Sequence, residues 1–72
     1  MKYLITEKPN SLVIFMDVFH LKTLCQIADL IEVEHPESVI EVTHNFNTKQ
    51  GSIILKKESI EFIDEIKEII DP

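Results

Sequence analysis

The sequence predicts an α+β fold, a two-layer open-faced sandwich in which two helices cover one face of a four-stranded, mostly antiparallel sheet. Three observations support this prediction. Two β-prone segments separated by turn residues open the chain, the apolar spacing changes to steps of three and four after residue 20, and strict alternation begins at residue 39. The expected order is β-β-α-β-β-α. With 72 residues, the chain forms a single domain spanning residues 1–72.

The first two strands are expected to form an N-terminal hairpin. Residues 2–6 are short and β-prone, and residues 7–11 contain Pro9, Asn10 and Ser11, which favour turns. Residues 12–19 are rich in β-branched and aromatic side chains. This composition predicts a central strand that is buried on both faces.

An amphipathic helix is expected to follow His20. Its apolar side contains Leu21, Leu24, Cys25, Ile27, Ala28, Leu30, Ile31 and Val33. Cys25 lies within this stripe, so we expect a buried thiol that packs as a small hydrophobic group. The helix should end near His35, because the residue before Pro36 disfavours the helical conformation.

The second half predicts another hairpin and another helix. Residues 39–46 alternate, with Ile40, Val42, His44 and Phe46 on one face and polar side chains on the other. Residues 47–51 form the loop, with the only glycine at the position expected to need a positive φ. Residues 52–57 form the returning strand of this hairpin. Ser59 is the expected N-cap of a final helix over residues 60–70, whose core stripe is Ile60, Ile63, Ile66 and Ile70.

Composition excludes several classes of protein and of site. The chain has no Arg and a net charge of −6, which argues against a nucleic-acid binder. A single cysteine excludes a disulfide scaffold and suits a reducing compartment, so the expected location is cytoplasmic. The longest apolar run, residues 12–16, is far shorter than a membrane span. We expect no metal site, no cofactor and no deep small-molecule pocket.

His20 is the strongest candidate for chemistry. It lies where a strand ends and a helix begins, and the amides of a helix N-terminus favour anions. A histidine there can carry a phosphoryl group, with Lys22 as the adjacent cation. The alternative is that His20 is an ordinary polar residue at the start of the helix.

Two segments resemble the phosphocarrier HPr family. Residues 18–24 (VFHLKTL) are similar to its phosphohistidine motif, although Lys22 stands where the family has Arg. Residues 55–66 are similar to its regulatory segment, in which a serine opens a short helix. The resemblance implies an HPr-like sheet, His20 as transient phosphoryl acceptor, Lys22 as its electrostatic partner and Ser59 as a regulatory phosphorylation site. The alternative for Ser59 is an ordinary N-cap.

Two functions are therefore expected. The first is an HPr-like module that acts through protein–protein contacts and serves as a histidine phosphocarrier of the sugar phosphotransferase system. The second is a non-enzymatic interaction or regulatory domain, as a homodimer or bound to another protein. In neither case is the chain expected to be an enzyme beyond carrying a phosphoryl group at His20.

Overall fold

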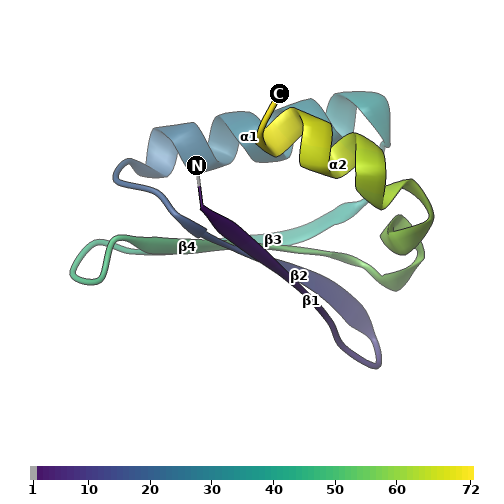
Figure 1. Ribbon diagram of the computed structural model, residues 1–72, viewed down its shortest axis with the longest axis horizontal. Coiled ribbons are helices and arrows are strands. Elements are labelled where there is room, and N and C mark those ends of the chain that lie inside the picture. The colour runs from purple at the N-terminus through teal and green to yellow at the C-terminus, as the bar shows by residue number, and fades with distance from the viewer. Residues whose placement is uncertain (1) are drawn as a thin grey trace.

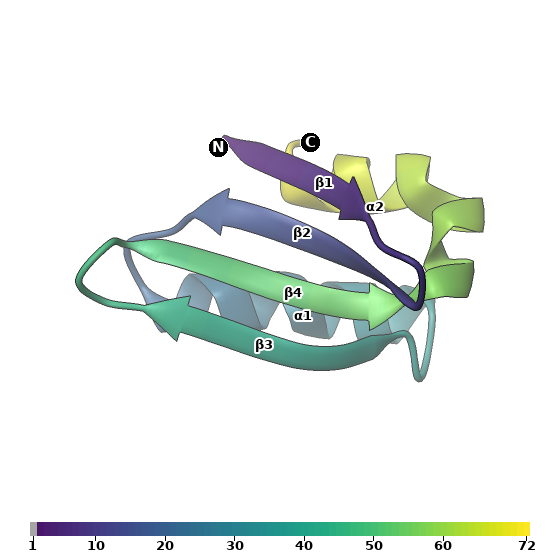
Figure 2. The ribbon, with the colours of Figure 1, turned by 90° about the horizontal axis from the view of Figure 1, so that it is seen from below.

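Four antiparallel strands form one sheet in the computed structural model, which describes residues 2–72. The strands are β1 (Tyr3–Glu7), β2 (Ser11–Asp17), β3 (Val39–Asn45) and β4 (Gln50–Lys56), in the spatial order β1-β2-β4-β3. Helices α1 (Leu21–Glu34) and α2 (Ile63–Ile70) lie on one face of the sheet, and the other face is open (Figures 1 and 2). This arrangement confirms the predicted α+β open-faced sandwich.

The register makes β2 and β4 the central strands. β2 pairs with β1 through Ile5 opposite Ile14, and with β4 through Ile14 opposite Ile53. The central position predicted for β2 is therefore correct. Burial on both faces is only partly correct, because Val13 on the open face is buried whereas Phe15 on the same face is 43% exposed.

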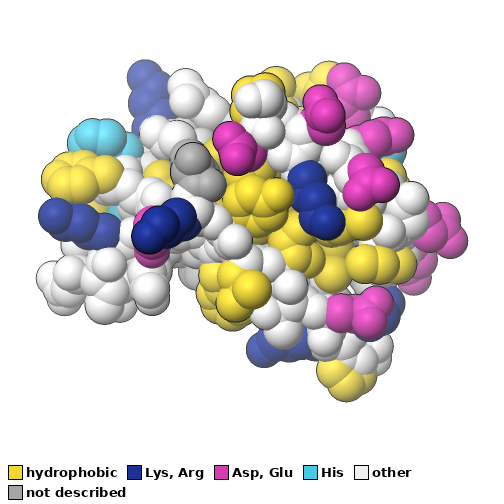
Figure 3. Space-filling view, in the orientation of Figure 1, with side chains coloured by type: hydrophobic (Ala, Val, Ile, Leu, Met, Phe, Trp, Pro, Cys, Tyr) yellow, Lys and Arg dark blue, Asp and Glu magenta, His cyan; other side chains and the backbone are white. Residues whose placement is uncertain are grey.

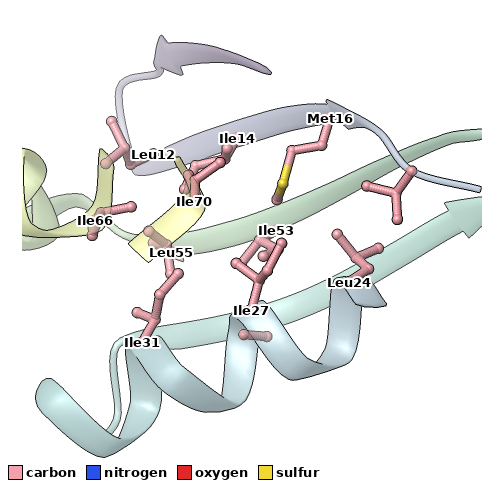
Figure 4. Packing of buried hydrophobic residues seen from close by; sticks show 12 residues of the cluster. Leu12, Ile14, Met16, Leu24, Ile27, Ile31, Ile53, Leu55, Ile66 and Ile70 are labelled. Carbon is pink, nitrogen blue, oxygen red and sulfur yellow. The ribbon is translucent and has the colours of Figure 1, made fainter. Parts of the chain in front are cut away.

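The core lies between the sheet and the helices (Figure 4). Every second residue of β2 and β4 points toward the helices, and α1 and α2 contribute residues spaced by three and four positions. These core residues are Leu12, Ile14, Met16, Ile53 and Leu55 from the sheet, with Leu24, Ile27, Ile31, Ile66 and Ile70 from the helices. Burial of this aliphatic surface supplies most of the driving force for folding.

The buried stripe of α1 is narrower than predicted. Only Leu24, Ile27, Ala28 and Ile31 are buried. Cys25 is exposed, so the prediction of a buried thiol is wrong. The helix advances 100° per residue, which places Cys25 and Val33 outside the sector that faces the sheet.

Glu32 joins the end of α1 to the start of β3. Its carboxylate accepts hydrogen bonds from the backbone amides of Glu37, at 2.9 Å, and Val39, at 2.6 Å. Glu37 adopts a positive φ of 66° in this turn. The helix ends at Glu34 and His35 is its C-cap, as the position of Pro36 predicts.

The final helix begins later than predicted. Residues Lys57–Phe62 form a 3₁₀ helix, η1, and α2 starts only at Ile63 with Phe62 as its N-cap. The expectation that Ser59 caps this helix is therefore wrong. Ser59 is buried in the middle of η1, whereas Ile60, expected in the core stripe, is 39% exposed.

The loop between β3 and β4 also differs from the prediction. Lys49, not glycine, takes the positive φ, and Gly51 lies within β4. A Cβ at Gly51 would lie 2.6 Å from Cδ2 of Leu24, so the glycine permits a close approach of α1 to the sheet. In β3 an irregularity between Val39 and Glu41 displaces Ile40 from the predicted face and leaves it 56% exposed.

Across residues 2–72, neither helix combines the length and the apolar composition that spanning a bilayer would require.

Candidate functional site at the loop end

Two loops distant in sequence meet at one end of the molecule. We call this the loop end and define it as residues 18–20, between β2 and α1, and residues 46–49, between β3 and β4 (Figure 1). The amide of Val18 donates to the carbonyl of Lys49 at 3.0 Å. The carbonyl of Val18 in turn accepts a hydrogen bond from Nε2 of His44 at 2.8 Å. These bonds hold the two loops together.

His20 occupies the N-cap position of α1. Its backbone is extended, with φ −115° and ψ 131°, and its carbonyl accepts from the amides of Thr23 at 3.1 Å and Leu24 at 3.4 Å. The side chain is exposed and makes no capping bond. Its ring meets the ring of Phe19 edge-on at a centroid distance of 4.8 Å. The structure therefore places His20 where a partner can reach its ring nitrogens.

The second predicted site residue, Lys22, lies in the first turn of α1 and is exposed, and no contact between it and His20 is found among the described residues. A different cation contacts the aromatic neighbour of His20. Nζ of Lys49 sits 4.6 Å from the centroid of the Phe19 ring, and that ring contacts His20. Sequence spacing could not identify Lys49, because it is 29 residues from His20 and the sheet brings it there.

Phe19 and Phe46 are the most prominent side chains of the loop end. They are 62% and 69% exposed. The Phe46 ring contacts the His44 ring edge-on at 4.7 Å. His44 is half-buried, and its Nδ1 is buried without a hydrogen-bond partner. Both phenylalanines were overlooked as site residues, although aromatic residues within turns are a usable signal.

Charge is distributed unevenly over the molecule. In Figure 3, Lys and His side chains gather at the left, over the loop end, whereas Asp and Glu side chains gather at the right, over α2 and η1. The loop end contains His20 and Lys49, and Asp17 borders it in the same hollow as Phe19 and Lys49. On a chain whose net charge is −6, this end is therefore the less acidic one.

Ser59 lies at the other end of α1. Together with His35 and Phe62 it lines a hollow of about 370 Å³ near the C-terminus of that helix. Helix α1, which has 14 residues and is about 21 Å long, separates Ser59 from His20. Ser59 is 1% exposed, and its Oγ has no hydrogen-bond partner. A kinase could reach this hydroxyl only if η1 opened, so the surroundings of Ser59 differ from those of an exposed regulatory serine.

In the described part of the chain, no three His, Cys, Asp or Glu side chains come together as metal ligands. No protein-family model matches the chain, and no curated protein or solved structure matches it either. Function has to be argued from the surface itself, and the loop end is the surface on which exposed aromatic, basic and imidazole groups coincide.

Proposed function

We propose that this chain is a small cytoplasmic protein-interaction module that docks an acidic surface of a partner protein through the loop end. The observation that carries the proposal is the pair Phe19 and Phe46, both more than 60% exposed on loops held by hydrogen bonds. Aromatic side chains are enriched at the centres of interfaces, where they contribute much of the binding energy. The free thiol of Cys25 suits a reducing compartment.

Both rings are held in place before any partner binds. Phe19 lies between Lys49 and His20, and Phe46 leans on His44. Immobilising a mobile side chain on association costs about 0.5–1.5 kcal/mol, and these contacts reduce that cost. The ammonium of Lys49, which lies on the Phe19 ring, favours a carboxylate on the partner, and raised salt should weaken that attraction.

A quantitative pull-down with immobilised wild-type chain tests this proposal. A specific partner should be retained by the wild type, lost by Phe19→Ala and Phe46→Ala, and released by raised salt. Val33→Ala is the matched control, because Val33 is 75% exposed on the outer side of α1. Equal retention by all variants, or no specific partner at all, would contradict docking through the loop end.

The second candidate function is phosphoryl transfer, and the exposed ring of His20 supports it. A phosphoryl group would leave a phosphorylated donor protein and form a P–N bond on a ring nitrogen of His20. The N-terminus of α1 and the ammonium of Lys49 would favour the added negative charge electrostatically. The similarity of residues 18–24 to the HPr motif points to the same chemistry.

Incubation with phosphoenolpyruvate and the general phosphoenzyme of the sugar phosphotransferase system tests the second function. We expect an acid-labile label that His20→Ala abolishes and His35→Ala retains. Absence of label, or label that survives His20→Ala, would exclude the phosphocarrier role and would leave docking through the loop end intact.

A further inference from the structure

Strand β1 has a free edge whose hydrogen-bonding groups can be identified. The amide of Asp17 donates to the carbonyl of Lys2, and the amide of Lys8 donates to the carbonyl of Ser11. Hydrogen-bonded pairs alternate in an antiparallel ladder, so the even-numbered residues of β1 bond to β2. The amides and carbonyls of Tyr3, Ile5 and Glu7 therefore point outward, away from the sheet.

The two edges of the sheet differ in how they are protected. β3 carries an irregularity between Val39 and Glu41, and the amide of Val39 is already bonded to Glu32. Such irregularities blunt an edge against further pairing. β1 has a regular register along all five residues. Tyr3 and Ile5 pack against the core and anchor this edge, and Lys57 contacts Glu7 and the carbonyl of Lys8 only at its C-terminal end.

A hollow lies on each side of β1. Leu4 and Phe15, which point to the open face, line a hollow of about 350 Å³ together with Lys2, Asp17 and Gln50. On the helix side, Tyr3 lines a hollow of about 330 Å³ together with Asp64, Lys67, Glu68 and Asp71 of α2 and the C-terminus. Figure 3 looks onto this side and shows hydrophobic surface between β1 and α2, with carboxylates gathered above it. The helix side of the edge thus has three carboxylates against one lysine beside hydrophobic surface, and the open face has the apolar side chains of Leu4 and Phe15.

We propose that the free edge of β1 binds an extended segment of a partner protein in which basic and apolar side chains alternate. The segment would add a fifth strand to the sheet, a recognised mode of peptide binding. Side chains directly opposite Tyr3, Ile5 and Glu7 would project to the helix side, where Lys or Arg meets Asp64 and Glu68. The intervening side chains would project to the open face, toward Leu4 and Phe15.

Charge selects a basic segment over a second copy of this chain. Two copies could pair through their β1 strands in two ways. In the first, both α2 helices lie on the same face of the joined sheet. In the second, the α2 helices lie on opposite faces. In the first arrangement, Asp64, Glu68 and Asp71 of one copy would approach the same residues of the other. Like charges brought together destabilise an interface. This surface is distinct from the loop end and does not depend on its function.

The probe for this proposal is a fluorescein-labelled peptide Lys-Val-Lys-Val-Lys-Val-Lys, compared with Glu-Val-Glu-Val-Glu-Val-Glu and with the basic peptide N-methylated at alternate amides. We expect the basic peptide to bind and each of the other two to bind at least tenfold more weakly. Asp64→Lys with Glu68→Lys should weaken binding at least tenfold. The matched pair Asp29→Lys with Glu34→Lys, exposed on α1, should change affinity less than threefold.

Amide hydrogen exchange provides the second readout. Saturating peptide should slow exchange of the amides of Tyr3, Ile5 and Glu7 at least tenfold and leave the amides of residues 46–49 unchanged. Phe19→Ala should not affect peptide binding, which separates this proposal from docking at the loop end. Equal binding of the N-methylated peptide, unprotected β1 amides, or protection that rises with protein concentration alone would overturn it.

Discussion

The two ends of α1 use similar residue types in opposite ways. At the N-terminal end, the side chains of His20, Phe19 and Phe46 are exposed on tied loops. At the C-terminal end, the side chains of Glu32, His35, Ser38 and Glu65 are bonded within the protein, and Ser59 is buried near them without a partner. We call these five residues the closed end. The position of a histidine beside a helix terminus therefore does not determine its role, because segments distant in sequence decide whether its ring is exposed or bonded within the protein.

The closed end is held by a set of internal contacts. Nε2 of His35 lies 2.5 Å from Oε2 of Glu65, and the His35 ring stacks on Phe62 with the centroids 3.5 Å apart. Oγ of Ser38 donates to the carbonyl of His35 at 2.6 Å. These contacts join α1 to η1 and α2, and they leave the closed end with a structural role. If the closed end is structural and the loop end is not, substitutions at the closed end should lower the free energy of unfolding more.

Ser59→Asp should have the largest effect. Ser59 is 1% exposed and its Oγ has no partner, so the new carboxylate would lose most of its solvation, with Glu58 lining the same hollow. The expected loss in free energy of unfolding is roughly 3–5 kcal/mol, measured by urea denaturation. Ser59→Ala is the control and should be neutral or slightly stabilising, because it removes an unsatisfied hydroxyl. A fully stable Ser59→Asp variant would show that the site is accessible and would restore its regulatory interpretation.

Glu32→Ala should have the next largest effect. It removes the carboxylate that accepts two backbone hydrogen bonds, one of them half-buried, between α1 and β3. We expect a loss of about 1.5–3 kcal/mol in the same measurement. Glu34→Ala, two residues away and exposed, should change stability by less than about 0.5 kcal/mol. If the two variants are equally stable, the turn does not depend on this carboxylate.

The His35–Glu65 pair should contribute less. The side chain of Glu65 is 64% exposed, and exposed ion pairs contribute about 0–1 kcal/mol because solvent screens them. A double-mutant cycle with His35→Ala and Glu65→Ala should give a coupling energy below about 1 kcal/mol. A coupling well above this value would mean that the pair, rather than the stacking of His35 on Phe62, holds α2 in place.

Phe19→Ala and Phe46→Ala should have the smallest effects on stability. Both rings are mostly exposed, so each substitution should change the free energy of unfolding by less than about 0.5 kcal/mol. The same substitutions should weaken partner binding by about 2 kcal/mol, as expected of central aromatic residues in an interface. Calorimetry and denaturation of the same samples separate the two effects. A large loss of stability would assign these rings to the fold and not to recognition.

Much of the fold could be predicted from local pattern. The order of the elements, the central place of β2 and the helix end near Pro36 all follow from periodicity and turn chemistry in the sequence. The errors arose where tertiary packing overrode the local signal. Gly51 suggested a left-handed turn, but it lies in β4 to make room for Leu24. The N-cap signal of Ser59 was overridden by burial of that residue within η1.

The candidate site was less predictable than the fold. His20 could be singled out because it follows a strand and precedes a helix, and the structure places it exposed at that junction. Lys49 and Phe46 reach the same end only through the antiparallel pairing of β3 with β4. A contact that depends on sheet register leaves no spacing signal in the sequence. The free edge of β1 is likewise visible only when the strand order is known.

Gly51 joins the packing of α1 to the position of the loop end. It lies opposite His44 in β3 and opposite Met16 in β2, directly beneath Leu24. Leu24 is one helical turn beyond His20, and His44 supports Phe46. A methyl group at residue 51 would lie 2.6 Å from Cδ2 of Leu24, so the flexible end of that side chain would have to move. The absent side chain at residue 51 thus sets how Leu24 packs, one turn from His20, and Gly51→Ala tests whether repacking beneath α1 is felt at the loop end.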